Sequence, residues 1–210
     1  MKNRIENLEV CEGDLPEGVT FPNGMAAIDA EMMGLNPHRD RLCLVQVGDG
    51  NGNVWLVKFS SNNYDAPNLK KLFADNRVTK ILHFARTDMV FFQTYLGIMP
   101  SPVYCTKIAS KLCRTYTDKH GLKNVCSELT GEKMDKEQQC SNWGAPTLTE
   151  AQKHYAASDV IYLHEMKIAL DERLKSLDRL HLAKQCFDFL PVRANLDYIG
   201  WENSDIFAHH

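Results

Sequence analysis

The stretch GMAAIDAE (residues 24–31) joins an apolar run to two acids. Successive side chains of a β-strand point to opposite faces, so Asp29 and Glu31, which are two residues apart, share one face. The apolar residues before them are typical of a buried strand. Two carboxylates on one face of a sheet repel each other unless a proton or a cation lies between them. The stretch therefore predicts a buried strand that carries part of a cation site.

Further strand-like runs follow this stretch. RLCLVQVG (41–48) and NVWLVKF (53–59) are joined by a turn rich in Gly and Asn, and with residues 24–31 they predict an antiparallel meander. VTKILHF (78–84) predicts another buried strand. Helical patterns are predicted at residues 66–75, 86–96, 105–115, 121–131 and about 148–190. This order predicts an α/β protein with a mixed sheet flanked by helices.

The composition is that of one ordinary globular domain. The chain has 210 residues, 44% hydrophobic and 24% charged, and lacks the apolar run of ~20 residues that a membrane helix needs. The first residues are polar, without the apolar centre of a signal peptide, so we expect a cytoplasmic protein. The seven cysteines are scattered and odd in number, which favours reduced thiols over disulfides or a zinc site. The net charge of −3 argues against non-specific coating of long nucleic acid.

Two more acids, Asp88 and Asp159, follow these two along the chain. Asp88 falls in the first turn of the predicted helix after the strand at residues 78–84, and Asp159 lies in the last helical region. Each acid alone has an ordinary explanation: a strand edge, the favourable N-terminus of a helix, or a solvated helix face. Together, four carboxylates without a softer ligand among them suit hard cations such as Mg²⁺ or Mn²⁺.

The combined motifs resemble the DEDD superfamily of 3′→5′ exonucleases, whose fold is ribonuclease H-like. The motifs are Asp29-x-Glu31, His83-x-x-x-x-Asp88 and Tyr155-x-x-x-Asp159. The ribonuclease D branch is similar over roughly residues 25–170. That similarity includes the segments GLKNVCSELTGEKMDKEQQCSNW (121–143) and LTEAQKHYAASDVIYL (148–163).

A closer resemblance is to the nanoRNase C family, short ribonuclease D relatives that degrade two-nucleotide RNAs. It includes the tail and spans nearly the whole chain, in the segments NPHRDRLCLVQV (36–47), VYCTKIASKLCRTYTDKHGLK (103–123) and LPVRANLDYIGW (190–201). The resemblance implies a 3′→5′ exoribonuclease with two divalent cations, Mg²⁺ or Mn²⁺. It also implies that Asp29 bridges both cations, that Glu31 and Asp159 serve the cation that carries the water, and that Asp88 serves the other.

HYAASD (154–159) offers two candidates for handling the attacking water, because the superfamily has a histidine branch and a tyrosine branch. TLTE (147–150) predicts a capping box with Thr147 as N-cap. Residue 154 would then lie in the second helical turn. Residues four apart share a helix face, whereas residues five apart are rotated by about 140°. The spacing therefore favours Tyr155 over His154 as the partner of Asp159.

Several residues are candidate substrate contacts. EMMGLNP (31–37) is similar to a stretch of oligoribonuclease, in which the leucine wedges between two bases, and this suggests the same role for Leu35; packing under the sheet is the alternative. Met32 lies in the same stretch. His83 could approach the sugar or terminal phosphate, or be a core histidine. Lys107 could attract phosphate from a basic helix face shared with Lys111 and Arg114, although such a face is usually only solvated.

The leading hypothesis is an enzyme that splits dinucleotides and very short single-stranded RNA to nucleoside monophosphates at the end of RNA decay. The alternatives are a ribonuclease D-like enzyme that trims longer RNA or DNA, and an inactive nucleotide-binding module. We expect an exonuclease domain at residues 1–190 and a tail at 191–210 that packs on the core or on a neighbouring subunit. Resemblance to nanoRNase C further implies a homo-oligomer, an octameric ring. Arg193 in the tail is a candidate clamp for a 5′-phosphate across such an interface.

Overall fold

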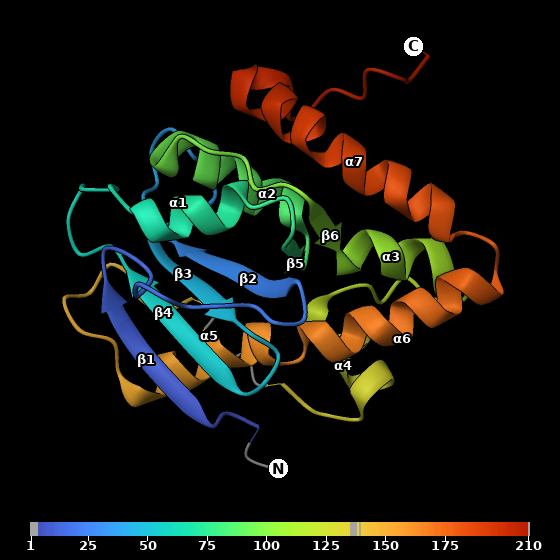
Figure 1. Ribbon diagram of the computed structural model, residues 1–210. Coiled ribbons are helices and arrows are strands. Elements are labelled where there is room, and N and C mark those ends of the chain that lie inside the picture. The colour runs from blue at the N-terminus through green and yellow to red at the C-terminus, as the bar shows by residue number, and fades with distance from the viewer. Residues whose placement is uncertain (1–3, 135–137, 139, 210) are drawn as a thin grey trace.

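The structure is a computed structural model that describes residues 4–134, 138 and 140–209. Residues 135–137 and 139, part of the segment that is similar to ribonuclease D, lie outside the described residues, as do 1–3 and 210. The described strands form a six-stranded sheet in the order β1-β4-β3-β2-β5-β6 (Figure 1). The strands are β1 (Asn7–Glu12), β2 (Met25–Met32), β3 (Leu42–Gly48), β4 (Asn53–Lys58), β5 (Thr79–Leu82) and β6 (Val103–Cys105).

Strand β2 lies inside the sheet and determines its mixed character. It pairs antiparallel with β3, which pairs antiparallel with β4, so the predicted meander is confirmed. On its other side β2 pairs parallel with β5, which is reached through helix α1 (Pro67–Ala74). Strands β1 and β6 extend the two edges with parallel pairing. The predicted class, a single α/β domain with a mixed sheet flanked by helices, is therefore confirmed.

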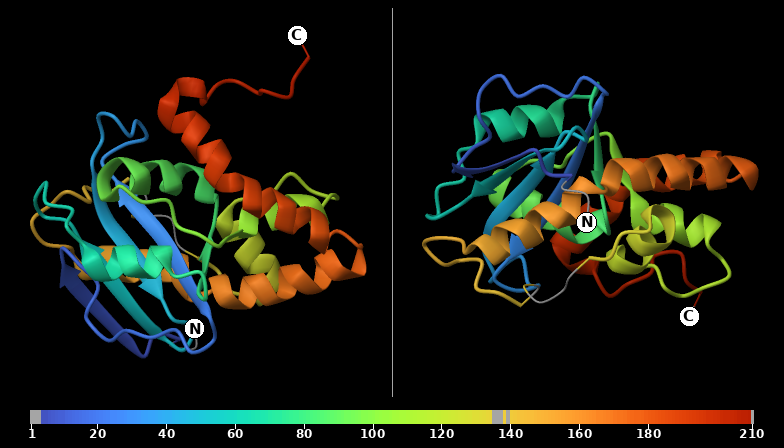
Figure 2. Two further views of the ribbon diagram at one scale, coloured as in Figure 1. Left: turned by 45° about the horizontal axis from the view of Figure 1, so that its top comes forward. Right: turned by 90° about the horizontal axis from the view of Figure 1, so that it is seen from below.

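Helices cover both faces of the sheet. Helix α5 (Glu150–Ile161) crosses one face, and α1 and α2 (Ala85–Phe91) lie over the other (Figure 1). Helix α7 (Leu180–Leu196) runs beside β6 and extends away from the sheet (Figure 2). The remaining elements are α3 (Thr106–Cys113), α4 (Leu122–Thr130), α6 (Leu163–Ser176) and two π-helical turns, η1 (Phe92–Leu96) and η2 (Asp197–Trp201).

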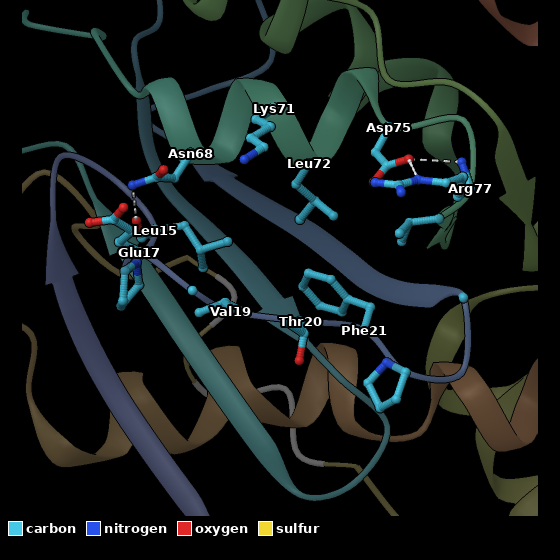
Figure 3. A pocket seen from close by; sticks show the side chains of 15 residues that line it. Leu15, Glu17, Val19, Thr20, Phe21, Asn68, Lys71, Leu72, Asp75 and Arg77 are labelled. Carbon is cyan, nitrogen blue, oxygen red and sulfur yellow. Dashed lines mark hydrogen bonds and ion pairs between the residues drawn. The ribbon is translucent and has the colours of Figure 1, made fainter.

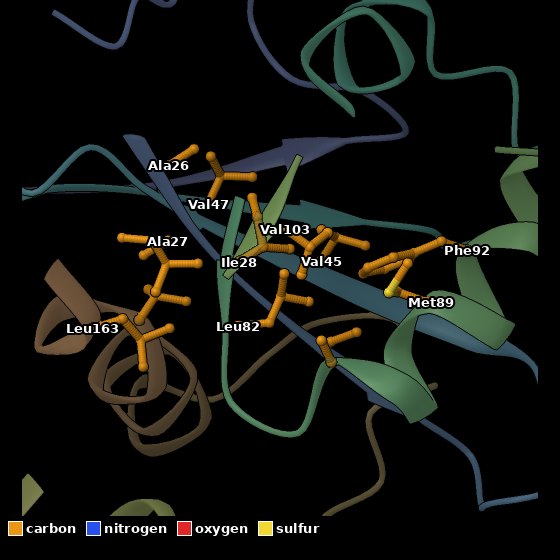
Figure 4. Close-up of a cluster of buried hydrophobic side chains, with 14 of the residues drawn as sticks. Ala26, Ala27, Ile28, Val45, Val47, Leu82, Met89, Phe92, Val103 and Leu163 are labelled. Carbon is orange, nitrogen blue, oxygen red and sulfur yellow. The ribbon is translucent and has the colours of Figure 1, made fainter. Parts of the chain in front are cut away.

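The core forms on both sides of β2. Ile28 of β2 and Val45 of β3 lie beside Met89 and Phe92, which follow each other along α2 and η1 (Figure 4). On the opposite face Ala27 lies near Leu163, at the start of α6. All of these side chains are buried. Burial of a side chain of this size contributes roughly 1.5–3 kcal/mol relative to exposure. The strand that carries Asp29 is thus held by apolar packing on two sides.

The structure adds three details to the sequence-based predictions. The edge strands β1 and β6 were not predicted, because β1 is polar and β6 has only three residues. The helical region at 148–190 is broken into α5, α6 and α7 at Tyr162 and again at residues 177–179. Neither break carries a Gly or Pro that could have marked it. Helix α7 continues past residue 190 through Pro191, so the expected boundary of the tail falls inside a helix.

The N-cap of α5 is two residues later than the sequence pattern indicated. Thr149, not Thr147, caps the helix: its hydroxyl accepts from the backbone N–H of Gln152, and the Gln152 side-chain oxygen accepts from the backbone N–H of Thr149. Glutamine serves as well as glutamate at the third position of a capping box, so Thr149 and Gln152 fulfil the motif two residues after the predicted one. His154 still lies in the second turn, so the argument about its direction is unchanged.

All seven cysteines are free thiols, five of them buried, as the scattered spacing predicted. Burial raises the pKa of the Cys11 thiol to about 12, so this side chain behaves as a small apolar group. Among the helices of the described residues, none combines the length and the apolar character needed to cross a membrane.

Candidate active site

Three carboxylates converge where α5 crosses β2. Asp29 and Glu31 point from β2 toward α5, and Asp159 points back from the helix, with carboxylate oxygens of all three within 4.8 Å of one another. The helix passes close to Gly48 on the neighbouring strand. A Cβ atom built there would lie 3.5 Å from Cγ2 of Val160, an ordinary van der Waals distance. The small residues Ala156 and Ala157 are also fully buried in this contact.

Asp88 joins this cluster from the other side of β2. It lies in the first turn of α2, directly after β5, and is buried. Burial and the charge of Asp29 both raise its pKa well above the usual range for a carboxyl. The structure thus brings together the four acids that the sequence predicted, from β2, α2 and α5.

The cluster is electrostatically strained when all four acids are charged. Burial raises the pKa of Asp29 to about 7. Burial, together with Asp29, Asp159 and Asp88, raises the pKa of Glu31 to about 10. A carboxyl resists ionisation when water is excluded and other negative charges are close. The pKa values are therefore those of an anionic pocket that binds protons when no cation is bound.

The donor set fits a hard divalent cation. All four donors are carboxylate oxygens, the ligands that Mg²⁺ and Mn²⁺ prefer. Asp29, Glu31 and Asp159 are close enough to share one ion, and the electrostatic contact between Asp29 and Asp88 extends the same negative pocket. A cation would compensate the repulsion that raises these pKa values, so the residues present fit such a group.

Tyr155 lies on the same face of α5 as Asp159, as predicted, and His154 is exposed. The Tyr155 ring packs against Trp143, with 6.0 Å between ring centroids, and Trp143 is buried in the core. Burial, followed by the charges of Asp159, Glu31 and Asp29, raises the pKa of Tyr155. The tyrosine therefore keeps its hydroxyl proton at neutral pH and presents it beside the acids.

A cavity of about 330 Å³ opens onto the acids. His83 lies in its wall, where burial and Lys107 lower its pKa to about 3, so the ring is neutral. The Thr106 hydroxyl donates to the carbonyl of Leu82 (3.2 Å), so its oxygen accepts from Nδ1–H of His83 (2.9 Å). Nε2 is then an acceptor, and it has no hydrogen-bond partner among the described residues. Nδ1 of His83 is thus bonded to the protein, and Nε2 can accept a hydrogen bond from a ligand.

A second cavity of about 620 Å³ adjoins the first at Phe84, which lines both. Leu35 lies in this cavity and is 83% exposed, so the alternative that it packs under the sheet is wrong. The Phe84 backbone is left-handed (φ 64°), a conformation that costs free energy for a bulky residue. Lys107 holds its Nζ 3.7 Å from the centre of the Phe84 ring. The arrangement presents an exposed aromatic face next to the acidic cavity.

Phe84 is a candidate functional residue that the sequence patterns missed. An aromatic residue after a strand carries no spacing signal, and only the backbone turn before α2 brings it to the cavity. Met32 lies half-buried at the end of β2, beside a register shift in the pairing with β3.

The basic face expected on α3 is only partly present. Arg114 is buried, donates to Glu128 and to the carbonyl of Lys119, and is therefore not available to a phosphate. The sequence pattern could not reveal this, because Glu128 comes from another helix. Arg193 forms an ion pair with Asp197 (2.9 Å) and donates to carbonyls of the tail. Both of its terminal nitrogens, Nη1 and Nη2, thus have partners within this chain.

A further cavity, of about 560 Å³, lies on the α1 side of the sheet. Leu15, Phe21 and Leu72 face it, and Asp75 and Arg77 pair at one end (Figure 3). None of the candidate residues lines this cavity. It is separate from the acidic cluster.

A sequence profile described as 3'-5' exonuclease matches residues 17–175 of this chain, and the chain belongs to that family. Its curated relatives include ribonuclease D of Acidiphilium cryptum, 33% identical over 153 residues and 73% of this chain. Ribonuclease D of Gluconacetobacter diazotrophicus is 34% identical over 154 residues. The chain spans about two fifths of the length of these relatives, 38% and 39%.

Solved structures extend the similarity to the whole chain. Brucella melitensis NrnC (nanoRNase C) bound to pGG is 48% identical, with a TM-score of 0.93 and coverage of 98% of this chain and 100% of that one. NrnC with bound Mg²⁺ is also 48% identical, with a TM-score of 0.92 and coverage of 97% and 99%. Escherichia coli RNase D is 26% identical, with a TM-score of 0.72 and coverage of 81% and 45%. The resemblance to ribonuclease D and nanoRNase C is confirmed.

The acid cluster predicts how stability depends on pH without metal. A carboxyl whose pKa is raised by folding contributes stability that is complete below its unfolded value of about 4 and is lost as the pH rises through its folded value. For Asp29 and Glu31 the folded values are about 7 and about 10. In a chelator, the thermal midpoint of the wild type should therefore fall relative to that of Asp29→Asn/Glu31→Gln between pH 5 and 9.

Scanning calorimetry of both proteins across this range measures the difference, because all other titrating groups are shared. Addition of Mg²⁺ should raise the wild-type midpoint most at the alkaline end. Parallel midpoints for the two proteins in chelator would contradict the assigned electrostatics.

Proposed function

We propose that the protein is a 3′→5′ exoribonuclease that hydrolyses dinucleotides and very short RNA to nucleoside monophosphates. The observation that carries the proposal is the junction of two cavities at Phe84, one lined by the acids and the other by Leu35 and Phe84. The acidic cavity suits a phosphodiester held by cations, and the exposed apolar side chains of Leu35 and Phe84 in the other suit a nucleobase. The similarity of the whole chain to an NrnC structure bound to pGG supports a substrate of this size.

Asp29, Glu31, Asp88 and Asp159 are proposed to hold two divalent cations, Mg²⁺ or Mn²⁺. When bound, such cations neutralise charge on the phosphate, lower the pKa of water and assist the departing oxygen. Asp29 is suited to contact both, because it interacts electrostatically with acids on its two sides. The chain supplies the carboxylates in fixed positions, from one strand and two helices.

Tyr155 is proposed to orient the attacking water. Its hydroxyl stays protonated at neutral pH and can donate or accept a hydrogen bond, whereas the exposed His154 is directed away from Asp159. His83 is proposed to accept a hydrogen bond at Nε2 from a hydroxyl of the 3′ sugar. A neutral acceptor fits this role, because sugar hydroxyls are donors and an imidazolium would repel the cations.

Substrate length is proposed to depend on Leu35, Phe84, Met32 and Lys107. The exposed Leu35 can insert between two bases, and the Phe84 ring offers a flat face on which a base can stack whatever its sequence. Lys107, held over the same ring, supplies positive charge for a phosphate. An apolar wedge and one stacking face serve a substrate of about two bases better than a long strand.

Trimming of longer RNA or of DNA is the second candidate, favoured by the curated ribonuclease D relatives. The convergence of four acids beside a tyrosine argues against an inactive nucleotide-binding module. The homo-oligomer, the octameric ring in particular, stays a prediction from the resemblance, as does the division into residues 1–190 and 191–210. Exposed apolar residues on α7 and in the tail, among them Val192, Trp201 and Phe207, are compatible with burial in such an assembly.

Length preference can be measured with 5′-labelled RNAs of two, three and seven nucleotides and a DNA duplex. The dinucleotide should be hydrolysed fastest, and Leu35→Ala should reduce kcat/KM for the dinucleotide by about tenfold, in line with stacking of 1–3 kcal/mol per base. Met33→Ala is the control, because Met33 is an exposed apolar residue two positions away. Faster trimming of the heptamer or the duplex by the wild type would contradict the proposal and favour a ribonuclease D-like trimming enzyme.

The water-orienting residue can be identified by comparing Tyr155→Phe with His154→Ala on the dinucleotide. Tyr155→Phe keeps the ring that packs against Trp143 and removes only the hydroxyl, so kcat should fall by roughly 100-fold with little change in thermal stability. His154→Ala should keep near wild-type kcat. The opposite pattern would assign the water to the histidine.

A further inference from the structure

Gln46, in the middle of β3, is the polar residue of a strand whose other residues are apolar or glycine and whose residues are all buried. It is fully buried, with an exposed fraction of 0%. Neither its amide nitrogen nor its amide oxygen has a hydrogen-bond partner among the described residues. A buried amide without partners costs free energy that an apolar residue of the same size would not. Its presence calls for a partner or a task beyond packing.

The sheet register places Gln46 directly opposite Asp29. The two residues are Cα partners in the antiparallel pairing of β2 and β3. Directly opposed residues project to the same face, with Cβ atoms roughly 4.5–5.5 Å apart. Gln46 therefore points to the α5 side of the sheet, next to the carboxylate that lies at the centre of the acid cluster.

The neighbours of Gln46 on that face of β3 and directly opposite on β4 are apolar: Leu44 and Gly48 precede and follow it, and Leu56 lies opposite. Lys58, a diagonal neighbour on β4, donates to the hydroxyl of Ser60 (2.8 Å). On β2, Asp29 is the directly opposed polar side chain, and Glu31 is the diagonal one.

We propose that Gln46 is a positioning residue for Asp29. Its amide N–H donates to the Asp29 carboxylate and holds the orientation in which that carboxylate meets the cations. A neutral amide suits this task, because a lysine or arginine in its place would compensate the charge of Asp29 and weaken cation binding. This inference rests on the proposed function. It adds Gln46 of β3 to the residues of β2, α2 and α5 that form the site.

The test compares binding of Mn²⁺ alone, without RNA, to the wild-type chain and to Gln46→Met. Methionine is similar in length and volume but has no donor. Loss of a residue that orients a metal ligand typically weakens metal affinity by about 10–100-fold, and calorimetry should show an increase in Kd of that size. The thermal midpoint in chelator should stay the same or rise, because two unpaired polar atoms leave the core.

The control is Leu44→Met, on the same strand and face, equally buried and opposite Glu31. It should leave Kd unchanged. Gln46→Leu, which has another shape, should weaken binding as Gln46→Met does if the donor is what matters, and it serves in place of Gln46→Met should that variant not fold.

Two outcomes would overturn the inference alone: wild-type affinity in both Gln46 variants, or an equal loss of affinity in Leu44→Met. Absence of Mn²⁺ binding by the wild type would instead overturn the proposed function, and the inference with it. The two failures are therefore distinguishable in one set of titrations.

Discussion

Repulsion among four closely spaced carboxylates is the constraint on which the rest of the structure depends. Carboxylate oxygens of Asp29, Glu31 and Asp159 are held within 4.8 Å of one another, and the charge of Asp29 also raises the pKa of Asp88. Such a cluster is unfavourable, and only a rigid frame can hold it. The apolar packing of β2 on both faces supplies that frame. Helix α5, which crosses the same face of the sheet, brings the last acid and Tyr155 into place.

The mixed sheet also places the residues that line two adjacent cavities. Antiparallel pairing with β3 brings Gln46 to Asp29, and parallel pairing with β5 brings His83 and Asp88 to the end of β2. Phe84, with its left-handed backbone, lies between the acidic cavity and the cavity that contains Leu35. In the proposed function, the first cavity would hold the phosphate and the second a base.

Local periodicity made part of this predictable. The shared face of Asp29 and Glu31 follows from strand alternation, and that of Tyr155 and Asp159 from the helical repeat, even though the N-cap is Thr149 and not Thr147. The predictions that failed concern contacts between residues that are distant in sequence. The sequence pattern placed Arg114 on a solvated helix face, whereas in the structure it donates to Glu128 of another helix. The role inferred for Gln46 needed the register of two strands, which no single segment reveals.

The central claim is that these acids retain protons until a divalent cation replaces them. Titration calorimetry with Mg²⁺ at pH 7, repeated in two buffers of different ionisation enthalpy, counts the protons released per cation bound. The account predicts release of about one proton or more, because the pKa values of Asp29 and Glu31 are about 7 and about 10 in the metal-free protein. Binding without proton release, or no binding at all, would contradict it.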